Sequence, residues 1–339
     1  MSELRKDFLT ERWVVIAPER GMRPVEPTPE PEDDTGVRAC PFCEGNEFMT
    51  PSEVLALRDH GEPNHRGWYV RVVPHKFPVL MVEGSAETHQ LGVHSWMEGI
   101  GAHEVVIESP VHHEDLAFMA QEQVMRVIWA WQQRVEDLRQ DRRFRHILVF
   151  RNHRTASGAT LRHPHSQVVA LPVIPQLVRE ELRGAQAYYE REGRCGFCDL
   201  LEEERGSRKR VVLETGHFVV VCGYAARFAY EVEIFPLTHA ADYLGMPAEM
   251  RADLAQVLQR TLQAYRSALF NPPYNLVIQL APSPVDEGEA ALLSESFHWH
   301  ISVMPHVSAP VGFEWGTEFY INPVAPEVAA AQLRQHVPS

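Results

Sequence analysis

The chain has 339 residues, of which 45% are hydrophobic, 9% aromatic and 23% charged, so it is long enough for two domains or one large one. Acidic residues outnumber basic ones by 46 to 32, and the formal net charge of -14 argues against nucleic acid or an anionic membrane surface as a partner. No apolar run approaches the roughly 20 residues of a membrane span, and the polar N-terminus is unlike a signal peptide. We therefore expect a soluble, cytoplasmic protein.

Short β-branched and apolar runs predict strands along the whole chain. In chain order they cover Trp13–Ile16, Trp68–Val73, Glu104–Ile107, His146–Phe150, Gln167–Leu171, Val211–Leu213, Phe218–Val221, Glu231–Phe235, Asn275–Leu280 and His300–Val303. Two longer segments, 114–142 and 248–269, carry apolar residues with a 3.6-residue period and are predicted to be helices. The acidic, proline-rich stretch at residues 25–37 is expected to be an exposed loop.

The order of these elements and of the cysteine and histidine motifs repeats once along the chain. Each half begins with a Cys-x-Phe-Cys motif, continues through strands to a long helix and a further strand, and ends on a His-x-His motif. Matched features in the same order are hard to attribute to chance, so an internal duplication is predicted. The expected fold is α+β, with tandem halves at residues 1–185 and 186–339, each an antiparallel sheet with one long helix.

The chain has only five cysteines, and four of them form two Cys-x-x-Cys pairs. A secreted disulfide scaffold would be richer in cysteine, which leaves metal binding or redox chemistry for these pairs. Histidines at matching places in each half favour metal, because they could complete the four tetrahedral ligands of zinc. The candidate sets are Cys40, Cys43, His112 and His163, and Cys195, Cys198, His239 and His298.

His113 stands next to His112 and is an alternative ligand that the sequence leaves open. In both candidate sets all four positions are filled by protein side chains, so no place remains for a catalytic water. One or two structural zinc ions per chain are therefore expected.

The motif His163-Pro-His165 offers a nucleophile beside the first metal set. In an extended backbone, residues two apart lie on one face, so a metal-bound His163 would hold His165 on a fixed frame. A neutral imidazole with a pKa of about 6.5 is a competent nucleophile at pH 7. The loop of small residues upstream, 152–160, could direct backbone N–H groups and hydroxyls toward phosphate oxygens.

These motifs resemble those of the galactose-1-phosphate uridylyltransferases, a branch of the histidine-triad superfamily. The resemblance is carried by His163-Pro-His-Ser-Gln167, with Gly158-Ala-Thr160 before it. It extends over most of the chain, through the segments 13–24, 40–43, 71–78, 297–301 and 312–317. It implies two histidine-triad-like halves and a homodimer whose active sites lie near the subunit interface. The second cysteine pair and the tail Gly316–Pro323 are similar to relatives that use ADP-glucose and phosphate.

The resemblance also implies a role for each matching residue. His165 would attack the α-phosphorus of a nucleotide sugar, forming a covalent nucleotidyl-histidine and releasing a sugar 1-phosphate. Gln167 stands where hydrolases of the superfamily have histidine, and an amide can bind phosphoryl oxygens but cannot pass a proton to water, so transfer is favoured over hydrolysis. The residues that would bind the phosphates, nucleotide and sugar are Arg20, Arg23, His75, Lys76, Asn152, Gly158, Ala159, Thr160, Phe313 and Glu314.

Two positions depart from many members of that family: His75 stands where asparagine is common, and Ser308 replaces a lysine. The expected reaction transfers UMP between a UDP-sugar and a sugar 1-phosphate, for example from UDP-glucose to galactose 1-phosphate. The alternatives are an ADP-sugar phosphorylase that uses inorganic phosphate and a zinc-stapled binding module without turnover. His300 is the counterpart of His165, and we expect it not to be the nucleophile because the segment before it, 282–289, is acidic.

Overall fold

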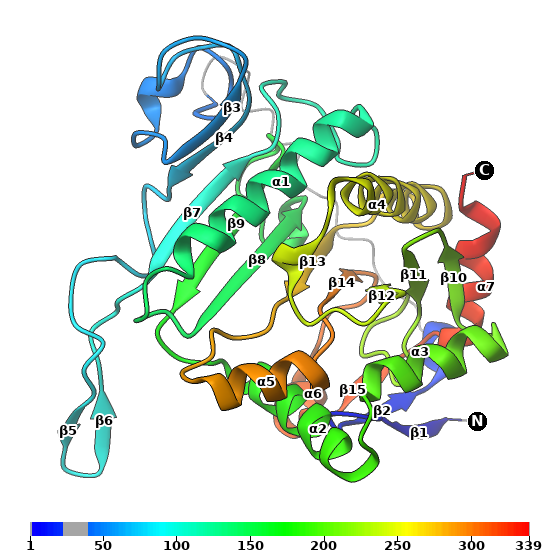
Figure 1. Cartoon of the computed structure of the whole chain (residues 1–339). Helices are drawn as coiled ribbons and strands as arrows, with labels where there is room; N and C mark the ends of the chain where they lie inside the picture. Colours follow the sequence, from blue (N-terminus) through cyan, green and yellow to red (C-terminus); the bar gives the residue numbers. More distant parts are fainter. Residues whose placement is uncertain (1, 23–39, 339) are drawn as a thin grey trace.

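The computed structural model describes residues 2–22 and 40–338, which are built around one long sheet (Figure 1). Ten strands form this sheet, and every neighbouring pair in it is antiparallel. Their order across the sheet is β10 (Val211–Glu214), β11 (Phe218–Val221), β12 (Val232–Pro236), β14 (His300–Pro305), β13 (Tyr274–Gln279), β8 (His146–His153), β9 (His165–Leu171), β7 (Ala102–Ile107), β4 (Trp68–Pro74) and β3 (Leu55–Arg58). The predictions for Arg23 and for the loop at 25–37 lie outside the described residues.

The sheet consists of two halves with the same topology. In each half the last two strands exchange places in the sheet, so that the orders β3-β4-β7-β9-β8 and β10-β11-β12-β14-β13 correspond strand by strand. In chain order a long helix follows the third strand of each half: α1 (Gln121–Leu138) lies between β7 and β8, and α4 (Ala248–Leu269) lies between β12 and β13. The predicted α+β fold with an internal duplication is therefore confirmed.

The two halves meet at β8 and β13, which occupy equivalent places in them. These strands pair from His153 with Tyr274 to Val149 with Ile278, so the half-sheets join without a gap in the hydrogen bonding. Antiparallel pairing of equivalent strands relates the halves by an approximate twofold rotation. The domain division at residues 185 and 186 falls inside α2 (Gln176–Glu192) and stays a prediction.

Helices α1 and α4 pack against each other and cover one face of the sheet (Figure 1). The apolar stripe of α1 is buried, including Val127 and Trp131, and burying each such side chain stabilises the fold by roughly 1.5–3 kcal/mol. Trp131 Nε1 also donates a hydrogen bond to Ser166 Oγ at 2.7 Å. Because side chains alternate along a strand, this bond fixes β9 from the face opposite to that of His165 and Gln167.

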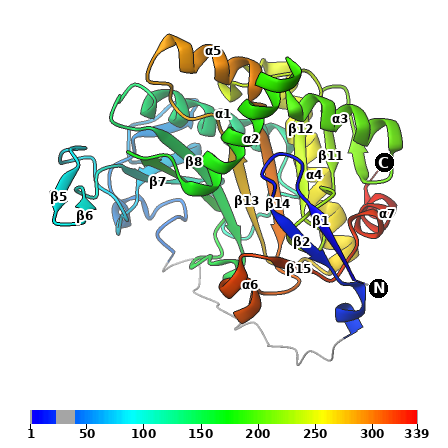
Figure 2. The ribbon, with the colours of Figure 1, turned by 90° about the horizontal axis from the view of Figure 1, so that it is seen from below.

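Smaller elements complete the fold, and several of them cover the other face of the second half (Figure 2). In the part of the chain that the structure describes, the smaller elements comprise a sheet and five helices. The sheet contains β1 (Glu3–Lys6), β2 (Trp13–Ile16) and β15 (Tyr320–Asn322), and the helices are α2, α3 (Gly196–Ser207), α5 (Glu287–Ser296), α6 (Gly312–Thr317) and α7 (Pro326–His336). The hairpin of β5 (His89–Leu91) and β6 (His94–Trp96) projects from the body (Figure 1). Among the helices of the described residues, none is long and apolar enough to cross a membrane.

The predicted strands are all present, whereas the helix predicted over 114–142 is shorter than expected. The residues before α1 form turns, in which Asp115 Oδ1 accepts a hydrogen bond from the Ala117 N–H at 3.0 Å. Leu116 and Met119 belong to these turns and are buried. Their spacing continues the apolar period of α1 to residues before its first turn, which is why the sequence predicted a helix that begins earlier.

The buried His146 gives a prediction about stability and pH. Its side chain is 1% exposed, and among the described residues neither ring nitrogen has a hydrogen-bond partner. Burial lowers its pKa to about 4, whereas the unfolded value is about 6.5. As the pH falls below 6.5, the unfolded state binds a proton that the folded state does not bind until about pH 4, so stability is lost across this window.

We expect His146→Leu to remove this loss. Relative to wild type, the variant should gain roughly 2 kcal/mol of unfolding free energy when the pH is lowered from 7 to 4.5, as measured by urea denaturation. Any packing cost of leucine applies equally at both pH values. A difference between the two proteins that does not change with pH would contradict the expectation.

Candidate active site and metal centres

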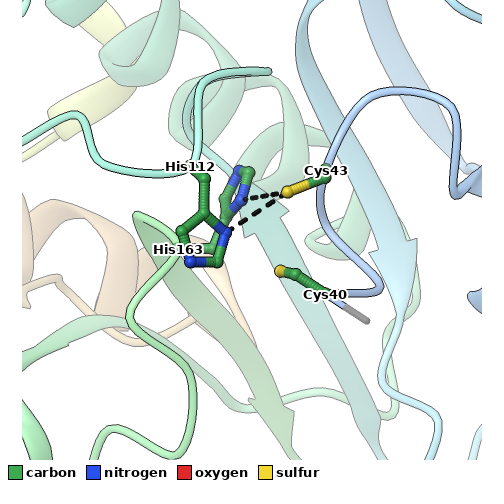
Figure 3. Close-up of side chains that lie close together, drawn as sticks. All are labelled: Cys40, Cys43, His112 and His163. Atoms are coloured by element: carbon green, nitrogen blue, oxygen red, sulfur yellow. Dashed lines mark hydrogen bonds between the residues drawn. The ribbon is translucent and has the colours of Figure 1, made fainter. Parts of the chain in front are cut away.

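Two cysteines and two histidines from distant parts of the first half meet in one buried cluster (Figure 3). Cys43 Sγ lies 3.2 Å from His112 Nδ1 and 3.6 Å from His163 Nδ1. Together with Cys40, all four ligand atoms lie within 4.8 Å of one another. A tetrahedral zinc ion with bonds of about 2.3 Å to sulfur and 2.0 Å to nitrogen would separate these atoms by about 3.5 Å. The cluster therefore has the donors and the spacing to hold a metal ion.

The histidines of this cluster are oriented to bind through Nδ1. His163 Nε2 donates a hydrogen bond to the Ser109 carbonyl at 2.7 Å, which leaves the lone pair on Nδ1. Burial lowers the pKa of His163 to about 4, so the ring is neutral at pH 7, as a ligand must be. His112 is buried in the cluster, whereas His113 is exposed and packs edge-on against it with ring centroids 4.6 Å apart. The structure thus brings His112 into the cluster and leaves His113 outside.

The second half repeats the cluster with Cys195, Cys198, His239 and His298. Cys198 Sγ lies 3.4 Å from His239 Nδ1 and 3.6 Å from His298 Nδ1. His239 Nε2 donates to the Ser294 carbonyl at 2.8 Å, the counterpart of the bond that orients the first cluster. His239 is exposed here, so the second cluster is more open to solvent than the first.

His165, the predicted nucleophile, begins β9 and is 7% exposed. Its Nδ1 donates a hydrogen bond to the His163 carbonyl at 2.8 Å, because a carbonyl can only accept. Nε2 therefore carries the lone pair, and burial lowers the pKa of the ring, which keeps it neutral at pH 7. Phe42, which stands between the two cysteines of the first cluster, packs edge-on against His165 with ring centroids 5.3 Å apart.

Two carboxamide side chains lie beside His165, and each is held by its oxygen. Gln167 follows on the same face of β9, and its Oε1 accepts a hydrogen bond from His103 Nε2 at 2.7 Å. The register between β8 and β9, continued to the end of β8, sets Asn152 opposite His165. Asn152 Oδ1 accepts from Asn275 Nδ2 at 2.7 Å. Both amides thus keep their NH₂ groups as donors for a ligand.

The small-residue loop after β8 lies against the same amide. Gly158 has a φ of +98°, a conformation that favours glycine, and a Cβ at this position would lie 3.3 Å from Asn152 Nδ2. Asn275 Nδ2 also donates to the backbone of this loop at 3.0 Å, so the second half fixes its position. Ala159 is buried and Thr160 is exposed.

The next predicted binding residues, His75 and Lys76, differ in their surroundings. The His75 ring stacks on that of His103, with centroids 4.2 Å apart and planes inclined by 5°. Its Nδ1 accepts a hydrogen bond from the Phe77 N–H at 3.0 Å. His75 therefore joins the cluster around Gln167 through His103, whereas Lys76 is exposed on the surface.

Three further predicted binding residues belong to the elements near β15. Arg20 is exposed on the short 3-10 helix Pro18–Met22, and Phe313 and Glu314 lie on α6, which contacts β15 (Figure 2). Within the described residues, none of the three forms a hydrogen bond or ring contact with His165. Their role in binding stays a prediction.

His300 repeats the backbone arrangement of the nucleophile in the second half. Its Nδ1 donates to the His298 carbonyl at 3.1 Å, but its Nε2 lies 3.8 Å from Glu181 Oε1. A cavity of about 120 Å³ beside His300 is also lined by Glu233, whose pKa burial raises to about 8. Ser302 also stands where the first half has Gln167, so this site lacks the corresponding amide donor, and the expectation that His300 is not the nucleophile stays a prediction.

Two family models match this chain. That of the galactose-1-phosphate uridyl transferase N-terminal domain matches residues 1–175, and that of a domain of unknown function (DUF4921) matches residues 115–338. Among curated proteins, the ADP-glucose phosphorylase of Arabidopsis thaliana is 34% identical over 98% of this chain and 92% of its own length. The galactose-1-phosphate uridylyltransferase of Thermotoga maritima is 29% identical over 99% of this chain and 98% of its own length.

Solved structures agree with these matches. A crystal structure of the Arabidopsis thaliana ADP-glucose phosphorylase with bound ADP-glucose has a TM-score of 0.84 and 33% identity, covering 99% of each chain. A uridylyltransferase structure has a TM-score of 0.75 and 26% identity, covering 99% of this chain and 98% of the other. Fold, site and sequence together define an enzyme of the nucleotidyltransferase class. Within that class, the chain belongs to the galactose-1-phosphate uridylyltransferase family, as its motifs predicted.

The two clusters give a prediction about metal content. We expect the purified protein to contain up to two metal ions per chain, measured by elemental analysis of metal-buffered samples. Cys40→Ser should lose one of them and lower the melting temperature by about 5 to 10 °C, because metal binding contributes directly to folding free energy. The matched variant Cys195→Ser should lower it less, since its cluster is more exposed. Folded, active protein that contains no metal would contradict this assignment.

Proposed function

We propose that the protein transfers a nucleoside monophosphate from a nucleoside-diphosphate hexose to a phosphate-bearing acceptor, through a covalent intermediate on His165. One observation supports this most strongly: His165 donates through Nδ1 to the His163 carbonyl, so Nε2 is the nucleophilic atom. Gln167 and Asn152, each held by its oxygen, offer NH₂ donors to the oxygens of the attacked phosphate.

In the first step, the Nε2 lone pair of His165 attacks the α-phosphorus of the nucleotide sugar. The new phosphorus–nitrogen bond forms as the bond from phosphorus to the bridging oxygen breaks, and the hexose 1-phosphate leaves with that electron pair. In the second step, an oxygen of the acceptor attacks the phosphorus, and the electron pair of the phosphorus–nitrogen bond returns to Nε2. Amide donors stabilise the negative charge on the phosphoryl oxygens in both steps.

The amide of Gln167 also favours transfer over hydrolysis. A carboxamide can donate hydrogen bonds but cannot remove a proton from water at neutral pH. An acceptor that already carries an ionised phosphate oxygen needs no such base. The same site can therefore release and accept phosphate-bearing groups without activating water.

We propose ADP-glucose and inorganic phosphate as the leading donor and acceptor. This choice is supported by 34% identity to the Arabidopsis ADP-glucose phosphorylase and by the TM-score of 0.84 to its structure. The tail Gly316–Pro323 and Ser308 favour the same choice. Transfer of UMP between UDP-hexose and hexose 1-phosphate, the reaction expected from the sequence, is the second candidate, supported by 29% identity to the Thermotoga enzyme.

We propose zinc as the metal of both clusters, because two thiolates and two imidazoles are the ligand set of structural zinc sites. With four protein ligands in each cluster, the metal would organise the fold and take no part in the reaction. In the first half it would hold the loop that carries Phe42 and the backbone of His163, and so the ring of His165. The homodimer and the cytoplasmic location stay predictions, and membership of this enzyme family disfavours a binding module without turnover.

The choice between nucleotides can be tested by trapping the intermediate. Protein incubated separately with ADP-glucose and UDP-glucose is separated from free nucleotide, and mild acid then releases the bound nucleotide for identification. We expect AMP from ADP-glucose, with adduct forming at least about tenfold faster than from UDP-glucose. Faster formation of a UMP adduct would favour the second candidate, and no adduct from either sugar would contradict nucleotidyl transfer through histidine.

The nucleophile can be tested by substitution. His165→Gly removes the attacking nitrogen but leaves the pocket, so the variant should bind nucleotide sugar, form no adduct and lose at least about 10⁴-fold in rate. Added imidazole should restore part of the activity by filling the space. The matched variant His300→Asn should still form the adduct. The reverse pattern would assign the nucleophile to the second half.

A further inference from the structure

His103, on β7, lies outside the motifs that carry the family resemblance, yet it contacts the proposed phosphate-binding amide. Its side chain is 9% exposed and faces the same side of the sheet as Gln167, since it pairs across the strands with Val169, two residues further along β9. The His103 Nε2 lies 2.7 Å from Gln167 Oε1. Its Nδ1 lies 3.2 Å from the backbone N–H of Val79.

These two contacts determine where the proton of the His103 ring lies. A backbone N–H can only donate, so Nδ1 must be the acceptor from Val79. In a neutral ring the single proton then resides on Nε2, which must donate to Gln167 Oε1. The amide of Gln167 is thereby fixed with its oxygen toward His103 and its NH₂ group away from it.

This orientation matters because the two ends of a carboxamide have opposite polarity. With its oxygen held, Gln167 presents N–H donors to a phosphoryl oxygen. If the amide rotated by half a turn, it would present its oxygen to the same group, and two acceptors would face each other.

We propose that His103 is a positioning residue that fixes the amide of Gln167 as a donor to the phosphoryl group during nucleotidyl transfer. This inference rests on the proposed function. His103 itself touches no reacting atom and acts only through Gln167.

Two features of the surroundings support this role. The His75 ring stacks on the His103 ring with centroids 4.2 Å apart, which limits rotation of the His103 ring. Burial lowers the pKa of His103, so the ring stays neutral and the single proton stays on Nε2.

The second half of the chain provides an internal comparison. Ser302 pairs with Glu233 as Gln167 pairs with Val105, so Ser302 stands at the place of Gln167. Two residues before Glu233, at the place of His103, stands Glu231, which forms an ion pair with Arg227 at 2.9 Å. The half that lacks the amide therefore also lacks the histidine, as expected if the two residues act together.

The hydrogen bond can be tested without substrate. Long-range ¹H–¹⁵N NMR spectra report which ring nitrogen of a histidine carries the proton, and the signals of His103 are assigned by their loss in His103→Asn. We expect a protonated Nε2 and an unprotonated Nδ1 at pH 7. The opposite tautomer would overturn the proposal, because Nε2 could not then donate to Gln167.

The function of the bond can be tested with a matched pair of variants. The amide nitrogen in His103→Gln lies as many bonds from Cα as His103 Nε2, whereas that in His103→Asn is one bond too short. We expect His103→Gln to retain the rate of adduct formation within a few-fold. His103→Asn should lose roughly 10-fold to 100-fold in this rate with little change in KM, because only the transition-state contact is misplaced. Val169→Ala, which removes the cross-strand neighbour of His103 without a polar contact, is the control and should keep the rate.

A double-mutant cycle separates positioning from a general structural effect. In a Gln167→Ala background, His103→Asn should cause no further loss, since the group through which it acts is gone. Equal losses in both backgrounds, or equal rates for the glutamine and asparagine variants, would overturn the proposal. Wild-type protein that forms no adduct with either nucleotide sugar would instead overturn the proposed function, so the two failures are distinguishable.

Discussion

The hydrogen bond from His165 Nδ1 to the His163 carbonyl is the contact on which the proposed chemistry depends. His163 serves two purposes in it: its side chain belongs to the metal cluster, and its backbone accepts the proton that decides which nitrogen of His165 is nucleophilic. Phe42, held between the two cysteines, packs on the same ring. A metal bound at this cluster would therefore control the position of the nucleophile without touching the substrate.

The second half repeats this frame but surrounds the histidine ring with different side chains. The second half has the same cluster and the same bond from His300 to the His298 carbonyl. What differs is the side chains that surround the ring: Ser302 replaces the amide, and Glu181 and Glu233 line the adjoining cavity. The Cys–His scaffold is thus repeated in both halves, while the amide of Gln167 has no counterpart in the second half.

Much of the fold and of the site could be predicted from the sequence, because local patterns carry that information. Short β-branched and apolar runs predicted ten of the strands. The repeated Cys-x-Phe-Cys and His-x-His motifs, with His112 and His239 at matching places, predicted both clusters. Helix α2 was missed because only Leu182 and Ala185 of its residues are buried, which leaves a weak apolar stripe. His103 and Asn275 were also missed, since their contacts depend on the register of strands that are far apart in sequence.

The stereochemical course at phosphorus tests the central claim most directly. A nucleotide sugar with a chiral phosphorothioate at the α-position is converted by the enzyme, and the configuration of the product is determined. Each in-line displacement inverts the configuration at phosphorus. Two displacements through His165 therefore predict net retention, whereas net inversion would show a single direct transfer between donor and acceptor and would contradict the covalent intermediate.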